Sequence, residues 1–384
     1  MMKIIKKNGK IEEFDGSKIV NAIKKSADRV MVSFTEDENN LVVNGVLEKI
    51  RDRECVKVSE LHNLVELSLM NVNPTVGQAY KHYRDYKKSF VGMLDDVYNK
   101  SLSIRYRGDK ENSNTDSTLV STKRSLIYNE LNTHFYEKFF LSEEEKLAHQ
   151  IGYIYIHDKS ARLDSMNCCL FDSQNVMRGG FDMGNMWYNE PNTVDVACDV
   201  LGDIIMMSAS MQYGGWSTRI DNLLAPYAEK SYKLYKEELL SYGLDEEVAE
   251  EKALYKTRRD LEQGAQGLEY KLNSVASSRG DYPFTTFALG LGTNRFELMV
   301  SKAFLDVRRK GQGKKGKERQ VLFPKLIFLY DENIHGEGKE HEWLFDCAID
   351  TSSVSMYPDY LSLTGDSYVC DMYKLYGEVV YPMG

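Results

Sequence analysis

Short apolar runs alternate with longer helical stretches through the second half of the sequence, and this alternation constrains the fold most. Residues 284–291 and 321–329 read as buried strands, because each is a short run dominated by apolar side chains. Residues 194–211 predict an apolar helix, and residues 222–253 predict a long charged helical stretch or a hairpin of helices. Strands separated by helices favour an α/β barrel or a wound sheet.

The first part of the chain, residues 1–92, reads as a separate small domain. Residues 3–7 and 10–14 predict two strands, joined by the type I′ turn signal Asn8-Gly9. Asp15 or Ser17 is expected to cap the helix that follows, because a short side-chain oxygen can accept from free backbone N–H groups. Further helices are predicted near residues 40–51, over 59–71 and from about Gln78, with Pro74 and Gly77 between the last two.

Charge and cysteine usage exclude several classes of protein. The net charge is −9, which argues against a general nucleic-acid-binding role, because such binding needs clustered Lys and Arg. No apolar run reaches the length of a membrane helix, and the N-terminus lacks the apolar core of a signal peptide, so a reducing cytoplasm is the expected compartment. The six cysteines form no CxxC pattern, so no metal site is expected in this chain.

A cluster of lysines near the N-terminus is the first candidate site. Lys6 and Lys7 flank the predicted turn, and Lys18 and Lys25 lie on one face of the predicted helix. Lysines beside a helix N-terminus suit a triphosphate, because point charges and free N–H groups both meet phosphate oxygens. A solvated basic face is the alternative interpretation of the lysines alone.

Residues 4–27, 58–62 and 79–88 resemble the ATP-cone that regulates ribonucleotide reductases. The resembling features are a lysine pair, an Asn-Gly turn, a Phe, a Lys-Ile pair at a helix start, and a closing helix rich in Tyr and Arg. The resemblance implies ATP and dATP as allosteric effectors, each favouring a different assembly. It implies a nucleotide pocket lined by Lys6, Lys7, Glu12, Lys18 and His62.

The second candidate site is the block YIYIHDKSARLDSMNCCLFD, residues 153–172. Two adjacent thiols beside apolar residues can simply be packed hydrophobes. The block also resembles the segment of the oxygen-sensitive, class III ribonucleotide reductases that carries a cysteine facing the radical cysteine. That role is assigned here to Cys168, which follows Asn167. Cys169 is the alternative, because neighbouring strand residues face opposite sides of a sheet.

Further blocks resemble the same family in the same order, and they cover most of the chain. One of them, residues 277–294, resembles the Pro-Phe-Thr block near the substrate and places Ser277, Pro283 and Phe284 there. The related pyruvate formate-lyases share the barrel, but the cone and the Asn-Cys-Cys block speak against them. The implied fold is α/β: an ATP-cone over residues 1–92, then part of a ten-stranded α/β barrel of the glycyl-radical type over residues 93–384. The other blocks are residues 111–118, 212–227, 321–335 and 357–362.

The last residues resemble the start of the family's finger loop, in which the radical cysteine usually follows Pro-Met-Gly. Met383 and Gly384 are therefore expected near the substrate, one residue before that cysteine. The radical glycine and a four-cysteine structural zinc site are expected only in a C-terminal part that this sequence does not include. An intein, an intron or a gene split in two would each give such an end, and the chain alone should be inactive.

The resemblance implies an anaerobic enzyme of deoxyribonucleotide biosynthesis for DNA replication. Ribonucleoside triphosphates would be its substrates, a radical-SAM enzyme its activase, and formate or a dithiol protein its reductant. The expected partners are the C-terminal half and further copies, in a homodimer or an effector-dependent oligomer. Two alternatives are a non-catalytic ATP/dATP sensor with a vestigial barrel and an unrelated structural protein with a fortuitous cone.

Overall fold

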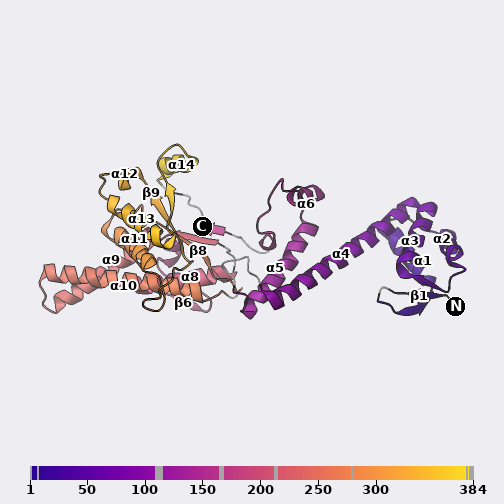
Figure 1. Cartoon of the computed structure of the whole chain (residues 1–384), viewed down its shortest axis with the longest axis horizontal. Coiled ribbons are helices and arrows are strands. Elements are labelled where there is room, and N and C mark those ends of the chain that lie inside the picture. Colours follow the sequence, from indigo (N-terminus) through magenta and orange to yellow (C-terminus); the bar gives the residue numbers. More distant parts are fainter. Residues whose placement is uncertain are drawn as a thin grey trace. The chain divides into compact units, whose positions relative to one another are not determined.

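The computed structural model forms two compact units, Met1–Asn99 and Lys100–Gly384 (Figure 1). The predicted domain boundary at residue 92 stays a prediction. Four predicted site residues, Lys7, Asn167, Met383 and Gly384, lie outside the described residues. In the described part of the chain, no helix is long and apolar enough to cross a membrane. The structure describes residues 2–6, 8–108, 116–163, 168–211, 215–277, 280–377 and 379.

The first unit contains a small three-stranded sheet. Strands β1 (Lys3–Ile5) and β2 (Ile11–Glu13) pair antiparallel, and β3 (Cys55–Lys57) pairs parallel with β1. Asn8 and Gly9 lie between β1 and β2 as predicted. Gly9 adopts a φ of 82°, and the Asn8 side chain accepts a hydrogen bond from the Lys10 N–H at 3.1 Å.

Apolar side chains of the helices bury one face of this small sheet. The core joins Ile4 of β1 to Ile23 of α1, Val46 of α2 and Leu69 of α3, each nearly or fully buried. α2 starts at a capping box in which the Thr35 and Glu38 side chains each accept from the other's backbone N–H. The helices are α1 (Ser17–Arg29), α2 (Glu36–Ile50), α3 (Val58–Val72) and α4 (Pro74–Arg107), and the division between the units falls within α4.

Two predicted helix starts in this unit are wrong. The N-cap of α1 is Gly16, which has no side chain to accept a hydrogen bond. Asp15, the residue before this N-cap, still accepts a hydrogen bond from the Ser17 N–H at 3.0 Å. α4 begins at Pro74 rather than near Gln78. Proline is compatible with a first helical position, because the N–H that it lacks would have no partner there.

The second unit is built on a parallel five-stranded sheet in the order β10-β9-β8-β7-β4. The sheet confirms the predicted α/β class. Both predicted strands form but are shorter than expected: β8 stops before Gly290, which has a φ of 117°, and β9 starts after Pro324, which has no N–H to donate. The strands are β4 (Cys168–Leu170), β7 (Gly215–Arg219), β8 (Phe284–Leu289), β9 (Lys325–Tyr330) and β10 (Asp359–Ser362).

Long helices cover one face of this sheet. Their apolar residues pack on Trp216, Phe287, Leu326 and Phe328, so we call this the helix face. The prediction for residues 194–211 is confirmed as α8, and the charged stretch after it forms α9 and α10, which lie side by side (Figure 1). The helices are α8 (Val194–Met211), α9 (Ile220–Ser241), α10 (Glu246–Ser274), α11 (Arg295–Lys310), α12 (Glu332–His335) and α13 (Glu342–Ser355).

The opposite face, which we call the inner face, has an apolar cluster toward the carboxyl ends of the strands. There Ala288, Ile327 and Leu329 pack with Leu363 and with side chains of α14 (Tyr368–Tyr376). The remaining elements all precede α8 in the sequence. They are α5 (Val120–Phe139), α6 (Glu143–Gln150), the 3₁₀ turn η1 (Lys159–Ala161), α7 (Ser173–Met177) and the antiparallel pair β5 (Phe181–Met183) and β6 (Met186–Tyr188).

A buried ion pair ties α10, α11 and the start of β9 together. The Arg308 Nε donates to Glu269 at 2.8 Å, and its Nη2 donates to the Pro324 carbonyl at 2.5 Å. Gln312 also donates to Glu269, which ties the segment after the end of α11 to α10. The Arg308 and Glu269 side chains are almost fully buried, so each charge is stabilised by the other in place of water.

Replacing Arg308 tests this dependence. Arg308→Met should lower the free energy of unfolding by about 3–5 kcal/mol, because it leaves the Glu269 carboxylate buried without its counter-charge. Urea denaturation followed by fluorescence measures the change. Arg295→Met is the matched control, since Arg295 pairs with Glu250 at the surface, where such pairs contribute little. Equal losses for the two variants would contradict the role of burial.

Candidate functional site

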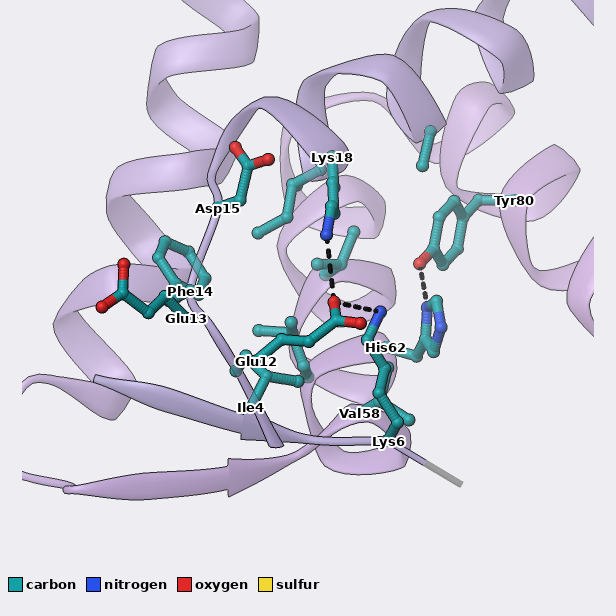
Figure 2. A pocket seen from close by; sticks show the side chains of 14 residues that line it. Ile4, Lys6, Glu12, Glu13, Phe14, Asp15, Lys18, Val58, His62 and Tyr80 are labelled. Carbon is teal, nitrogen blue, oxygen red and sulfur yellow. Dashed lines mark hydrogen bonds and ion pairs between the residues drawn. The ribbon is translucent and has the colours of Figure 1, made fainter. Parts of the chain in front are cut away.

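A pocket in the first unit brings most of the predicted nucleotide-binding residues together (Figure 2). Lys6, Glu12, Lys18 and His62 all line it, and its cavity volume is about 160 Å³. Lys25 is not among the lining residues, and Lys7 lies outside the described residues. The remaining lining residues are Ile4, Glu13, Phe14, Asp15, Ile19, Ala22, Val58, Leu61, Val65 and Tyr80.

The Glu12 carboxylate organises the cationic side of this pocket. The ammonium groups of Lys18, Lys6 and Lys10 lie 3.2, 3.3 and 3.7 Å from its oxygens, and Figure 2 shows the first two converging on it. Hydrogen bonds from Lys18 and then Lys6 hold the pKa of Glu12 below its usual range. The two lining lysines are thus held close together around one carboxylate, where a phosphate group could exchange with it.

The other side of the pocket combines apolar side chains with a contact between His62 and Tyr80. The Tyr80 hydroxyl lies 2.5 Å from Nδ1 of His62, and burial raises the pKa of Tyr80 to about 12. Ile4, Val58 and Leu61 are neighbouring apolar lining residues. Tyr80 was not among the predicted site residues, although its place in the segment AYKHYRDYKK, in the second turn of a helix rich in aromatic residues, was a usable signal.

The two adjacent cysteines point to opposite faces of the main sheet. In the parallel register Cys168 lies beside Gly215, and Cys169 lies beside Trp216. Cys169 packs against the core of the helix face, as the alternation of strand side chains requires. Cys168 is therefore on the inner face, where its side chain is exposed. Cys168 therefore does not fit the alternative interpretation of both thiols as packed hydrophobes, because β4 lies at the edge of the described sheet and pairs there with β7 alone.

Gly215 makes room for the Cys168 side chain. A Cβ added to Gly215 would lie 2.9 Å from Cys168 Sγ, closer than packed atoms allow. Desolvation raises the pKa of the Cys168 thiol, and Asp158 adds to the effect, while a hydrogen bond from the Gly215 backbone opposes it. Desolvation raises the pKa of Cys169 to about 11, with a further contribution from Cys168. Both cysteines therefore favour the protonated thiol at neutral pH.

The residues predicted to lie near the substrate are only partly brought together with Cys168. Phe284 pairs with Gly215, so it lies two strands from Cys168 at the same level of the sheet. Its ring contacts Phe323, and the Lys325 ammonium lies 4.5 Å above it. Ser277 and Pro283 are buried in the segment that leads into β8. Their proximity to a substrate stays a prediction.

Two family models match the chain. The model described as anaerobic ribonucleoside-triphosphate reductase matches residues 111–384, and the model described as ATP cone domain matches residues 2–89. Together they cover both units.

The matching curated relatives are anaerobic ribonucleoside-triphosphate reductases. The protein from Haemophilus influenzae is 29% identical over 400 residues, which cover 99% of this chain and 54% of that protein. The one from Escherichia coli is 30% identical over 395 residues, which cover 99% and 53%. A crystal structure of the Thermotoga maritima anaerobic ribonucleotide reductase with dATP and CTP matches at 15% identity and a TM-score of 0.44, over 73% of this chain and 50% of that one. The chain spans about half the length of the curated relatives it matches.

The raised pKa of Cys169 gives a pH-dependent prediction. In a Cys168→Ser variant, alkylation of Cys169 by iodoacetamide should rise about tenfold per pH unit between pH 7 and 9.5 without levelling off, because only the thiolate reacts and desolvation, the larger cause of the raised pKa of Cys169, remains when Cys168 is replaced. Peptide mass spectrometry follows the rate, and alkylation of exposed Cys55 in the same digest reports reagent access. A plateau below pH 9.5 would contradict the raised pKa.

Proposed function

Since the chain belongs to the anaerobic ribonucleoside-triphosphate reductase family, we propose that it supplies the effector-binding and thiol-bearing half of such an enzyme. The reaction would convert ribonucleoside triphosphates to deoxyribonucleoside triphosphates for DNA replication. The family match over residues 111–384 supports the reaction class. The placement of Cys168 carries the proposal for this chain's own role, because that thiol is exposed on the inner face beside Gly215.

Cys168 would act as a reducing thiol toward the ribose. Transfer of a hydrogen atom needs a protonated thiol, and the raised pKa of Cys168 keeps it in that form. Cys169 packs against the helix face and is a less suitable reductant. Formate or a dithiol protein would then restore the reduced state.

The first unit would bind ATP or dATP in the pocket of Figure 2. The ATP-cone match and the chemistry of the lining residues support this assignment. The lysines around Glu12 would hold the phosphates, and the apolar side with His62 and Tyr80 would hold the base. Binding would favour one assembly of the enzyme over another, to the extent that the effector binds the two with different affinity.

The other catalytic groups would correspond to the part of the relatives' sequences that this chain does not cover. These would include the radical cysteine, the radical glycine and the structural zinc site, with a radical-SAM enzyme as activase. The chain would need this complementing half for activity and would work in the reducing cytoplasm as a dimer or an effector-dependent oligomer. A non-catalytic ATP/dATP sensor is the second candidate, and the intact cone pocket favours it as strongly as it favours an enzyme.

The nucleotide pocket is tested by removing one of its lysines. Lys18→Ala should weaken ATP and dATP binding about tenfold or more, because a charge-assisted contact to phosphate is lost. Isothermal titration calorimetry on the full chain measures the affinity. Lys25→Ala, on the same helix but outside the pocket, has the same change in charge and should bind like the parent chain. Equal weakening by both variants would point to a general charge effect.

The catalytic role is tested by reconstitution. The chain should be mixed anaerobically with a complementing C-terminal half, the activase, ATP and CTP, and the formation of deoxycytidine triphosphate measured. Cys168→Ser should abolish the product, whereas Cys169→Ser should retain most of it. A normal glycyl-radical signal in both variants would show that activation is intact. Nucleotide binding without product from the parent mixture would favour the sensor instead.

A further inference from the structure

A cysteine that the proposed function does not use lies next to a lysine, between two helices that cover the helix face. The Lys302 ammonium of α11 donates to the sulfur of Cys347 on α13, over a distance of 3.9 Å. Cys347 is a free cysteine, and both side chains are partly exposed. A small oxidant can therefore reach this sulfur while an amine lies beside it.

The packing of α11 against α13 fixes the positions of this pair. The two helices lie side by side (Figure 1). One turn beyond Cys347, the buried Thr351 hydroxyl lies 2.8 Å from the carbonyl oxygen of Cys347 and 3.4 Å from that of Leu305 on α11. The contact between the amine and the sulfur thus belongs to a packed helix interface rather than to a loop.

Asp306 holds the Lys302 ammonium near the sulfur, but it has other cationic partners. Its carboxylate oxygens lie 2.9 and 3.2 Å from Lys302 Nζ, which is one turn earlier on α11. The Nη2 atoms of Arg258 and Arg309 lie 3.5 and 3.4 Å from the same carboxylate. The Asp306 side chain is only 7% exposed and needs a counter-charge, which the two guanidinium groups supply because they stay protonated. Lys302 can therefore release its proton to water and leave Asp306 neutralised.

The chemistry of an oxidised thiol gives this contact a use. Peroxide converts a thiol first to a sulfenic acid, which condenses with a neighbouring thiol or nitrogen atom. If neither is in place, further peroxide gives the sulfinic and sulfonic acids, which small thiols do not reverse. At Cys347 the Lys302 amine is in place for the condensation.

We propose that Lys302 and Cys347 form a modification site at which hydrogen peroxide links α11 to α13 through a sulfur–nitrogen bond. The thiol reacts with one peroxide to give the sulfenic acid and water, so that sulfur is oxidised and peroxide is reduced. The neutral amine of Lys302 then attacks that sulfur, and the displaced hydroxyl group leaves with one amine proton as a second water. Two molecules of a small thiol reverse the link, restore the amine and the thiol, and leave as a disulfide.

The link would protect Cys347 from irreversible oxidation. Its sulfur would be held as a sulfenamide, from which a reductant regenerates the thiol, instead of passing to the sulfinic acid. The link would also join two helices that follow different strands of the main sheet. This inference rests on the geometry of α11 and α13 and does not depend on the proposed reductase function.

Peptide mass spectrometry on the full chain tests the site. After treatment with hydrogen peroxide, the peptides that carry Lys302 and Cys347 should be joined, with a mass about 2 Da below the sum of the two separate peptides. Dithiothreitol should separate them again. Lys302→Arg is the matched control, because it keeps a positive charge beside Asp306 but its protonated guanidinium cannot attack sulfur. In this variant the joined peptide should be absent, and dimedone should capture Cys347 as the sulfenic acid.

Four results would overturn the proposal. Recovery of Cys347 in the parent only as sulfinic or sulfonic acid would show that the amine does not reach the sulfur. Recovery of Cys347 as an unmodified thiol, while exposed Cys55 in the same sample is oxidised, would show that peroxide does not reach it. A joined peptide in Lys302→Arg would assign the nitrogen to another residue. A joined peptide about 14 Da heavier than the sum would place an oxygen atom between nitrogen and sulfur and exclude the direct bond.

A second variant guards against an effect of misfolding. Cys347→Ser removes the sulfur and should give no joined peptide, with a circular dichroism spectrum like that of the parent. In the parent, peroxide should raise the midpoint of thermal unfolding and dithiothreitol should reverse the rise, because a cross-link restricts the unfolded chain. A rise of the same size in Cys347→Ser would show that another oxidation causes it, which would contradict the link between the helices.

Discussion

The alternation of side chains along the parallel strands β4 and β7 is the constraint on which the rest of the second unit depends. Because successive residues face opposite sides, one of two adjacent thiols enters the helix-face core and the other is presented on the inner face. The same alternation places Gly215, Ser217 and Arg219 of β7 on the inner face, which Cys168 shares. Gly215 leaves room for the thiol in its observed position, because a Cβ there would lie 2.9 Å from Cys168 Sγ and the thiol would have to move.

Carboxylates hold cationic side chains in both units, but these carboxylates differ in burial. In the second unit, Arg308 with Glu269 and Arg219 with Asp221 use fully or nearly buried carboxylates to hold guanidinium groups. In the first unit, Glu12 is partly exposed and holds lysines that an incoming phosphate could recruit. The buried pairs resist exchange because breaking them leaves an unsolvated charge, whereas the exposed one can exchange at small cost.

The long periodic elements could be read from the sequence with little error. The apolar helix over residues 194–211 forms as predicted, and both apolar strands form. The errors occur at element ends, where one residue decides the outcome. Gly16 occupies the cap position of α1 in place of Asp15 or Ser17, and Pro74 starts a helix that periodicity placed later. Ends depend on backbone geometry over a single turn, which periodicity does not report.

The sequence by itself determined the order of elements, the family through its ordered blocks, and the set of charged residues near the N-terminus. The resemblance to the ATP-cone predicted a pocket lined by Lys6, Glu12, Lys18 and His62. Only the tertiary structure brings them together with Tyr80 and the apolar lining residues, because these side chains come from different elements that meet through packing. It also decided which thiol is exposed and placed Ser217 beside Thr286, although 68 residues separate them in the sequence. Parallel pairing brings distant strands together in a register that depends on the whole core, so local sequence could not specify these neighbours.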